Sequence, residues 1–496
     1  MKFLTQAIVA CVVAATARAA TPEQWRGRSI YQLLTDRYAR TDGRTTAACD
    51  TQNRDFCGGT WRGIINRLDY IQRMGFTAIW ISPVTYNIPD RTLYGYGYHG
   101  FWQQDLYKLN DHFGTAEDLK ELSKILHERG MYLMVDVVAN HNGWNGDWRT
   151  VDYSRFYPFN DQKYFHRYCP LLNYSNQTEV EDCWLGDSKV VLPDLNTQDS
   201  SVVEQYGKWI KELVSNYSID GLRVDTAKLV DKAFWSSFQQ AAGVFCSGEV
   251  FAGDAFYTCD YQNSLDSVLN YPQYWPLMLF LNSTTGTSGP LLDSLSSMQS
   301  TCKDVSVLGT FSENHDLPRF ASQTDDMALA KNVLAYTVLS DGIPIVYAGQ
   351  EQHYSGYADP DNREATWLSG YSQESELFKL LTAVNSVRNR ALYLDESYAT
   401  YHIHALWNDP NTAVFRKGYD GYQIISVITN KGASSGSWML TVENVGLAPG
   451  KNVVDVLTCK QITVGDGGYL VIVMDGGLPR VYFPVDAAKG SGICGL

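Results

Sequence analysis

Short apolar runs alternate with amphipathic stretches from about residue 25 to residue 400. The clearest apolar runs lie at residues 76–84, 132–138, 220–224, 305–311 and 342–347. Between them, apolar residues recur three and four positions apart before Gly130 and again before Gly221, which is the spacing of one helix face. Strand, helix and strand in series predict a parallel sheet with right-handed crossovers.

The repetition of this pattern and the length of the chain together indicate how the sheet is arranged. An α/β chain of this length favours a closed (β/α)8 TIM barrel over an open, doubly wound sheet. No Gly-x-Gly-x-x-Gly sequence follows the first apolar run, so a dinucleotide-binding sheet is disfavoured.

Two stretches interrupt the alternation. Residues 141–195 are rich in Gly, Asn, Asp, Tyr and Trp and are too long for a connection, so we expect a small inserted domain after strand 3 of the barrel. From residue 401 the helical spacing disappears, and alternating runs joined by turn residues predict a C-terminal antiparallel β-sandwich at 401–496. The barrel is then expected at 20–140 and 196–400.

The first 19 residues have the features of a secretory signal peptide. Lys2 precedes an apolar stretch, and Ala17-Arg18-Ala19 fits a cleavage site. The alternative, a membrane-spanning helix, is disfavoured because the apolar stretch is short and has no stop-transfer flank. No later segment is apolar enough to span a bilayer, and the C-terminus has no hydrophobic tail for a lipid anchor. We therefore expect a secreted, extracellular protein with no membrane partner, and a monomer by default.

Composition narrows the classes of partner. Hydrophobic residues make up 45% of the chain, enough for large cores, and the net charge of −14 disfavours nucleic acid as a partner. The 13 Trp and 32 Tyr are suggestive of sugar binding because flat aromatic faces pack on sugar rings, although such residues more often belong to the core.

Nine cysteines follow the predicted leader, and in an oxidising compartment most of them should pair. Cys49 with Cys57 and Cys169 with Cys183 are close enough to close small loops, while spacing alone does not match the others. Cys246 lies in an apolar run and is the best candidate for the unpaired, buried thiol. No C-x-x-C pair occurs, which disfavours a zinc site. Sequons for N-glycosylation begin at Asn173, Asn176, Asn216 and Asn282.

Polar side chains are concentrated where apolar runs end. Four such places are residues 136–141, 221–225, 248–250 and 313–316. They supply Asp225, Glu249 and Asp316 from three different strand ends. Retaining cleavage of a glycosidic bond needs one carboxylate that attacks and one protonated acid that donates to the leaving oxygen. A nearby Arg223 would keep one acid ionised, while desolvation and like-charge repulsion would keep another protonated.

Each of these residues also has an ordinary structural interpretation. An aspartate at a strand end is often a helix cap, and Arg223 with Asp225 could be an ordinary ion pair. His141 and His315 could be hydrogen-bonded structural histidines, and Asn140 a turn residue. The conjunction of all four segments favours a retaining glycosidase.

These four segments resemble the four ordered motifs of the α-amylase family, glycoside hydrolase family 13. The resemblance extends over nearly the whole chain after the leader, through residues 215–221 and 342–351, and is to secreted fungal members of the Taka type. It implies endo-acting, retaining hydrolysis of internal α-1,4-glucosidic bonds in starch, glycogen and maltooligosaccharides.

The resemblance also implies residue roles. Asp225 would be the nucleophile, Glu249 the general acid/base, and Asp316 the group that holds sugar hydroxyls in the transition state. The substrate-binding side chains that it implies are His99, Phe101, Trp102, His141, Arg223, Lys228, His315, Asp359 and Arg363.

A structural calcium ion (Ca2+) between the inserted domain and the barrel is implied as well. Its ligands would be the side chains of Asn140 and Asp194 and the backbone carbonyls of Glu181 and Leu229, oxygen donors that suit a hard cation. The implied disulfides are Cys49–Cys57, Cys169–Cys183, Cys259–Cys302 and Cys459–Cys494.

The chain departs from the family pattern at the edge of the expected site. Phe101 stands where a tyrosine is usual, Leu229 where a histidine follows the lysine, and Ala252 where the Taka type has an aspartate. We expect these changes to alter product length or the balance of hydrolysis and transfer. A 4-α-glucanotransferase or an α-glucosidase on the same barrel is the alternative function. A non-catalytic glucan-binding protein is disfavoured because it would not need three intact carboxylates.

Overall fold

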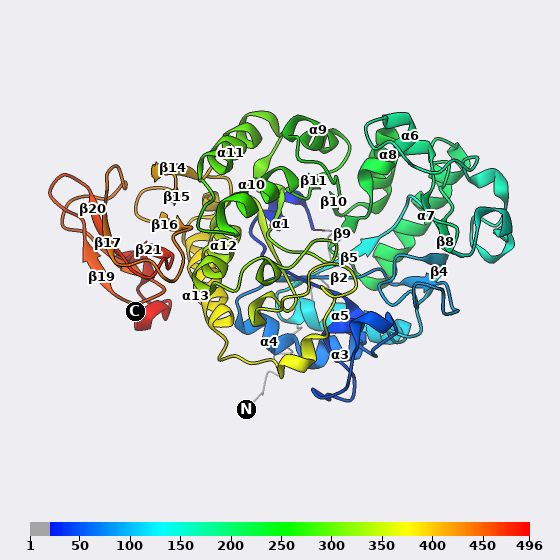
Figure 1. Cartoon of the computed structure of the whole chain (residues 1–496), viewed down its shortest axis with the longest axis horizontal. Helices are drawn as coiled ribbons and strands as arrows, with labels where there is room; N and C mark the ends of the chain where they lie inside the picture. Colours follow the sequence, from blue (N-terminus) through cyan, green and yellow to red (C-terminus); the bar gives the residue numbers. More distant parts are fainter. Residues whose placement is uncertain (1–19) are drawn as a thin grey trace, which may run out of the picture.

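The computed structural model describes residues 20–496, so the predicted signal peptide at 1–19 lies outside the described residues. Figure 1 shows the barrel in the middle of the molecule. The C-terminal strands, drawn in orange and red, lie at one end of the long axis, and the segment around residues 141–195 lies at the other. Among residues 20–496, no helix has both the length and the apolarity needed to cross a membrane.

Eight parallel strands form the barrel. They are β1 (Ile30–Leu33), β2 (Ala78–Ile81), β5 (Tyr132–Val137), β9 (Gly221–Val224), β10 (Phe245–Gly248), β11 (Ser267–Val268), β12 (Gly309–Phe311) and β13 (Ile343–Tyr347). Hydrogen-bonded neighbours follow the order β11-β10-β9-β5-β2-β1-β13-β12. A parallel bridge between Leu269 and Gly309 joins the two ends of this order, which confirms the predicted closed barrel.

Helices surround the barrel. They include α3 (Trp61–Asn66), α4 (Leu68–Arg73), α5 (Ala116–Glu128), α7 (Ser200–Tyr217), α8 (Lys232–Ala242), α9 (Ala255–Asp260), α10 (Tyr271–Leu281), α11 (Gly289–Thr301), α12 (Met327–Leu339) and α13 (Glu376–Leu394). The predicted apolar face of α5 is buried, and a capping box formed by Thr115 and Asp118 begins that helix. Asp199 caps α7 with a single contact, in which its side chain accepts from the amide of Ser201.

Two predicted strands are shorter than their apolar runs. The strand in the run 305–311 covers only the last three residues, because Val305–Val307 forms a 3-10 turn, η7. The Asp304 side chain accepts from the amide of Ser306 at 2.9 Å and thereby begins the turn. In the run 76–84, only the four residues of β2 form a strand.

The excursion after β5 forms a small unit of its own. Its antiparallel sheet has the order β6-β8-β7, from β6 (Trp144–Asn145), β8 (Val190–Leu192) and β7 (Leu185–Gly186). The amide of Leu195 donates to the Asn140 carbonyl and that of Asn142 donates to the Pro193 carbonyl, so the two ends of the excursion lie side by side. This is the geometry of an inserted domain, although its limits at 141 and 195 stay a prediction.

The C-terminal region is the predicted antiparallel sandwich. One sheet has the order β14-β15-β16-β21-β18-β19, and the other pairs β17 with β20. Their bounds are β14 (His404–Asp409), β15 (Thr412–Lys417), β16 (Ile424–Thr429), β17 (Trp438–Val442), β18 (Asn452–Asp455), β19 (Gln461–Thr463), β20 (Leu470–Met474) and β21 (Arg480–Pro484). Buried side chains of both sheets share one core, including Val427, Leu440 and Ile472.

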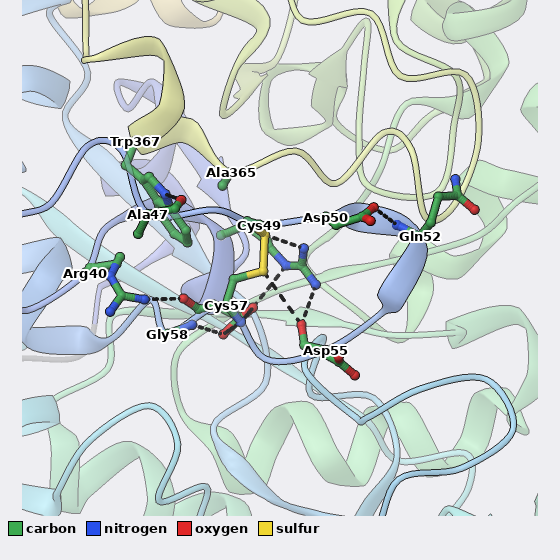
Figure 2. The surroundings of a disulfide bond; sticks show 12 residues. Arg40, Ala47, Cys49, Asp50, Gln52, Asp55, Cys57, Gly58, Ala365 and Trp367 are labelled. Carbon is green, nitrogen blue, oxygen red and sulfur yellow. Dashed lines mark hydrogen bonds and ion pairs between the residues drawn. A yellow bond between two sulfur atoms is a disulfide. The ribbon is translucent and has the colours of Figure 1, made fainter.

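The structure contains four disulfides in the pairing that the family resemblance implies, and Cys246 is a buried thiol. Figure 2 shows the bond between Cys49 and Cys57. Nearby, Trp367 donates from Nε1 to the Ala47 carbonyl at 2.8 Å (Figure 2). The side chain of Gln52 also hydrogen-bonds to Asp361. The disulfide loop is therefore attached to the loop that follows β13.

Candidate active site

A cleft of about 750 Å³ opens at the carboxyl ends of the barrel strands. It is lined by the three predicted catalytic carboxylates, Asp225, Glu249 and Asp316. The predicted substrate-binding side chains that line it are His99, Phe101, Trp102, His141, Lys228, His315, Asp359 and Arg363. Arg223 is buried and contacts two of the three carboxylates.

Asp225 follows directly after β9, where the strand ends in the cleft. Its Oδ1 accepts from Arg223 Nη1 at 2.7 Å, and its Oδ2 accepts from the Thr226 hydroxyl at 3.2 Å. The same Arg223 nitrogen binds Asp136 of β5 at 3.0 Å. Burial raises the pKa of Asp225 to about 7, while the Arg223 guanidinium opposes that rise.

Glu249 follows β10 and faces the same guanidinium. Arg223 Nη2 lies 2.9 Å from Glu249 Oε2, and the amide of Thr226 donates to that oxygen at 3.0 Å. Burial also raises the pKa of Asp136 well above its usual range. Because one cation faces three buried carboxylates, the cluster as a whole favours keeping a proton near neutral pH.

Asp316 follows β12 and is the most accessible of the three acids, with 36% of its side chain exposed. Gln32 Nε2 lies 2.8 Å from His315 Nδ1 and can only donate, so the ring proton belongs on Nε2, which lies 3.2 Å from Asp316 Oδ2. Arg363 Nη2 donates to Asp316 Oδ1 at 3.3 Å. Asp316 thus accepts a hydrogen bond from Arg363 and lies beside the neutral imidazole of His315.

The other histidines of the cleft are held neutral. Burial lowers the pKa of His141 to about 4 and lowers the pKa of His99 well below its usual range. The amide of Phe101 donates to His99 Nδ1 at 3.0 Å, which leaves Nε2 as the protonated nitrogen. The Phe101 ring stacks on His315 with centroids 5.2 Å apart. The cleft therefore combines a flat apolar face with neutral N–H donors.

One wall of the cleft is apolar and was not predicted. It consists of Tyr174, Leu185, Leu192, Leu229 and Phe251. Lys228 donates from Nζ to the Phe251 carbonyl at 2.9 Å, which directs the ammonium group along this wall. Of these residues, only Leu229 is named in the sequence analysis, as a carbonyl ligand for calcium and as a departure from the family pattern.

The residues implied as calcium ligands fit an oxygen-ligated cation. Asp194 is buried, its Oδ1 has no hydrogen-bond partner, and burial raises its pKa to about 7. The backbone carbonyl of Asn140 accepts from the amide next to Asp194, and the His141–Asp194 bridge brings these segments together. Glu181 lies in α6 (Gln177–Asp182), which packs against η5 (Ala227–Leu229).

This set contains one carboxylate besides an amide and two backbone carbonyls. Among residues 20–496, no group of three or more His, Cys, Asp or Glu side chains is placed to hold a metal ion. The site is therefore suited to a structural cation rather than to a side-chain cluster of the zinc type.

The sequence does not predict three residues that contact and orient side chains of the site. Asp136 lies in the motif at residues 136–141, but the sequence alone assigns it no role. In the structure it shares Arg223 with Asp225. Tyr271 lies at the start of α10 and contacts Glu249, and Gln32 of β1 contacts His315. Asp136 could have been found as a charged residue inside an apolar run, whereas Tyr271 and Gln32 carried no sequence signal of their own.

Comparison with known proteins identifies relatives that match most of the chain. Residues 32–386 match a family model described as "Alpha amylase, catalytic domain", and residues 405–496 match one described as "Alpha-amylase, domain C". The chain is 53% identical to "Alpha-amylase 2" of Schwanniomyces occidentalis over 470 residues, which cover 95% of this chain and 92% of the relative.

Solved structures that resemble this fold include α-amylases. An α-amylase from Malbranchea cinnamomea is 54% identical, with a TM-score of 0.93, and the match covers 96% of this chain and 100% of that one. An α-amylase from Geobacillus thermoleovorans, solved with acarbose, is 28% identical with a TM-score of 0.80, covering 93% and 98%.

Proposed function

Because the chain belongs to the α-amylase family of glycoside hydrolases, we propose that it is an endo-acting enzyme that hydrolyses internal α-1,4 bonds of starch, glycogen and maltooligosaccharides. The observation that carries the proposal is the contact of Asp225 and Glu249 with one guanidinium, in the cleft that Asp316 also lines. Two carboxylates on adjacent nitrogens of Arg223 are close together. Close carboxylates favour direct attack over attack by an intervening water.

In the first step Asp225 attacks the anomeric carbon. Its oxygen forms a bond to that carbon while the bond to the leaving glycosidic oxygen breaks, and Glu249 gives that oxygen a proton. Attack requires ionised Asp225, so kcat/KM falls as the pH drops below the pKa of this group. Arg223 at 2.7 Å stabilises the ionised form and holds the attacking carboxylate in position.

In the second step Glu249 acts as the base. It removes a proton from a water molecule, which attacks the glycosyl–Asp225 ester, frees the carboxylate and restores the original anomeric configuration. A sugar hydroxyl in place of this water would give transfer instead of hydrolysis. The family resemblance implies that Lys228 faces the leaving-group side, and its ammonium group lies along the apolar wall, so we propose that the two outcomes compete beside that wall.

Asp316 and its donors hold the sugar. Asp316 accepts hydrogen bonds from sugar hydroxyls, and His315 and Arg363 keep its two oxygens oriented. His99 and His141 supply further contacts to hydroxyl groups, and Phe101 offers a flat face to the ring. Trp102, Lys228 and Asp359 complete the binding surface.

Calcium would be held by Asn140, Asp194 and the carbonyls of Glu181 and Leu229. When bound, it supplies a positive charge that ties the inserted segment to the barrel beside the cleft. The four disulfides support secretion, because such bonds persist in oxidising compartments. We take the secreted enzyme to act as a monomer on carbohydrate substrates.

The test is Asp225→Asn in a time course on soluble starch that follows iodine colour, reducing ends and product lengths together. The variant should lose at least about 10³-fold in kcat while it still folds and binds glucan, since the covalent step is removed with little change in volume. Asp293→Asn, at an exposed position of α11, is the matched control.

The outcomes separate the functions. Early loss of iodine colour with short maltooligosaccharides shows endo-hydrolysis. Redistributed chain lengths with few new reducing ends would identify a glucanotransferase, and glucose released from chain ends an α-glucosidase. Full activity of Asp225→Asn would overturn the assigned nucleophile.

A further inference from the structure

A buried tyrosine contacts the proposed acid/base. Tyr271, the first residue of α10, is fully buried, and its hydroxyl lies 3.2 Å from Glu249 Oε1. Its ring packs against Phe251 and Phe311, with centroids 4.7 and 5.0 Å away. Burial of the ring and its contacts with these two aromatic side chains therefore restrict the position of the hydroxyl.

The direction of this hydrogen bond follows from Asn314. The amide of Asp316 donates to Asn314 Oδ1 at 2.9 Å, and an amide N–H can only donate, so Asn314 Nδ2 must be the atom facing Tyr271. Nδ2 donates to the Tyr271 hydroxyl oxygen at 3.1 Å. The single hydroxyl hydrogen of Tyr271 is then available for Glu249 Oε1.

The two oxygens of Glu249 thus have different surroundings. Oε2 accepts from the Thr226 amide at 3.0 Å and forms an ion pair with the Arg223 guanidinium, whose Nη2 lies 2.9 Å away. Oε1 receives one donor, from Tyr271. The positive charge beside Oε2 opposes a proton on that oxygen, whereas Oε1 accepts only the Tyr271 hydrogen bond and keeps its second lone pair for a proton.

We propose that Tyr271, oriented by Asn314, is a positioning residue that makes Oε1 of Glu249 the oxygen that delivers and recovers the catalytic proton. This inference rests on the proposed role of Glu249 and deepens it. Tyr271 does two things: it fixes the rotation of the carboxyl group, and its donated hydrogen bond favours the ionised form over the acid.

Other charged and titratable groups also face Glu249. They come from β9 and the segment after it (Arg223, Asp225 and Lys228), from β5 (Asp136) and from the segment after β12 (His315). Replacing the Tyr271 hydroxyl leaves all of them in place. A change in pH dependence can then be attributed to the missing hydrogen bond.

The experiment compares the pH profiles of kcat/KM on starch for the wild type and Tyr271→Phe. Loss of a donor to a charged acceptor should move the alkaline limb up by about one pH unit, because the acid form persists to higher pH. We also expect kcat on the plateau to fall about threefold to tenfold, since a weaker and less oriented acid transfers its proton more slowly.

A substrate that needs no acid separates positioning from structure. α-Maltotriosyl fluoride loses fluoride with little protonation, so Tyr271→Phe should lose less activity on it than on starch. Asn314→Asp is the second variant: its new carboxylate oxygen would accept the Tyr271 hydrogen and turn it away from Glu249, which should also raise the alkaline limb. Tyr274→Phe removes a hydroxyl from the same helix and is the matched control, with an unchanged profile expected.

An unchanged alkaline limb in both variants, or equal losses on both substrates with the wild-type thermal midpoint, would overturn the inference and leave Tyr271 a packing residue. Glu249→Gln distinguishes this failure from failure of the proposed function. If Glu249→Gln keeps turnover on starch, the acid/base assignment itself is wrong. If Glu249→Gln loses turnover while Tyr271→Phe keeps the wild-type pH profile, only the proposed role of Tyr271 is wrong.

Discussion

Arg223 shows how a single buried side chain organises the chemistry of this cleft. It is the shared partner of Asp136, Asp225 and Glu249, through nitrogens 2.7 to 3.0 Å from the nearest carboxylate oxygen of each. A buried charge without a partner would destabilise the fold, but here the guanidinium and the carboxylates compensate one another's charge. The result is a rigid arrangement of acids whose protonation depends on burial and on one cation.

Leu229 and Ala252 lie at positions where the chain departs from its family. Leu229 lines the cleft, and it also packs with Leu171 and Val180 in a small apolar core. The family resemblance implies that position 229 faces the incoming sugar. We therefore propose that leucine makes the acceptor side less polar than the histidine that is usual there.

We predict that Leu229→His together with Ala252→Asp changes the proportions of maltooligosaccharide products without abolishing cleavage. The added polar groups should alter acceptor binding by about 1 kcal/mol, roughly a fivefold change in the ratio of transfer to hydrolysis. The products of maltopentaose, separated by chromatography, are the measurement. Leu172→His, at an exposed leucine of the same segment, controls for an added imidazole. An identical product pattern would rule the idea out.

Among the elements, the short helix α1 (Pro22–Arg26) closes the amino-terminal end of the barrel. Its Trp25 is fully buried, donates from Nε1 to the Asp220 carbonyl at 3.0 Å and stacks on Phe245 at 5.2 Å. A Cβ atom added at Gly221 would lie 2.6 Å from the Trp25 ring. The first residue of β9 is thus glycine because the tryptophan occupies the space beside it.

We expect Gly221→Val to lower the free energy of unfolding by about 1–3 kcal/mol, because the added side chain overpacks the contact with Trp25. Activity should fall as well, since β9 carries Arg223 and leads into Asp225. Urea unfolding followed by tryptophan fluorescence measures the first effect. Gly27→Ala is the control, as nothing lies within 4 Å of its added Cβ. A midpoint equal to that of the wild type would contradict the overpacking argument.

For the whole molecule, the inserted segment is joined to the barrel at the site proposed for calcium. The two chain ends of the segment meet at Asn140 and Leu195, and α6 packs on η5 next to the cleft. A cation bound only by the folded state stabilises it in proportion to the logarithm of its concentration. Loss of the ion should therefore loosen one wall of the active site.

Exhaustive chelation should lower the thermal midpoint by at least about 3 °C, and added calcium should restore it. Scanning calorimetry with and without EDTA is the measurement. Asp194→Asn removes the charged ligand and should make the midpoint insensitive to EDTA. If chelation leaves the wild-type midpoint unchanged, the proposed ligands do not form a tight site.

The barrel, the sandwich and the position of the three acids could be predicted because they depend on local patterns. Apolar runs of strand length alternate with helical spacing, and parallel strands end at one face, so polar residues after such runs must meet there. Asp225, Glu249 and Asp316 line one cleft for this reason. The limits of η7 were not predictable, because the Asp304 side chain competes with an apolar run that looks like a strand.

Residue types and their order along the chain thus decide which elements form and which acids reach the cleft. Only the tertiary structure decides which side chains contact and orient the groups of the site. Tyr271 contacts Glu249, which is 22 positions away in sequence, and Gln32 contacts His315, which is 283 positions away. Such contacts join side chains from separate elements, and no periodicity in the sequence records them. They arise because closing the barrel brings distant strand ends within hydrogen-bond distance, where burial makes each polar group require a partner.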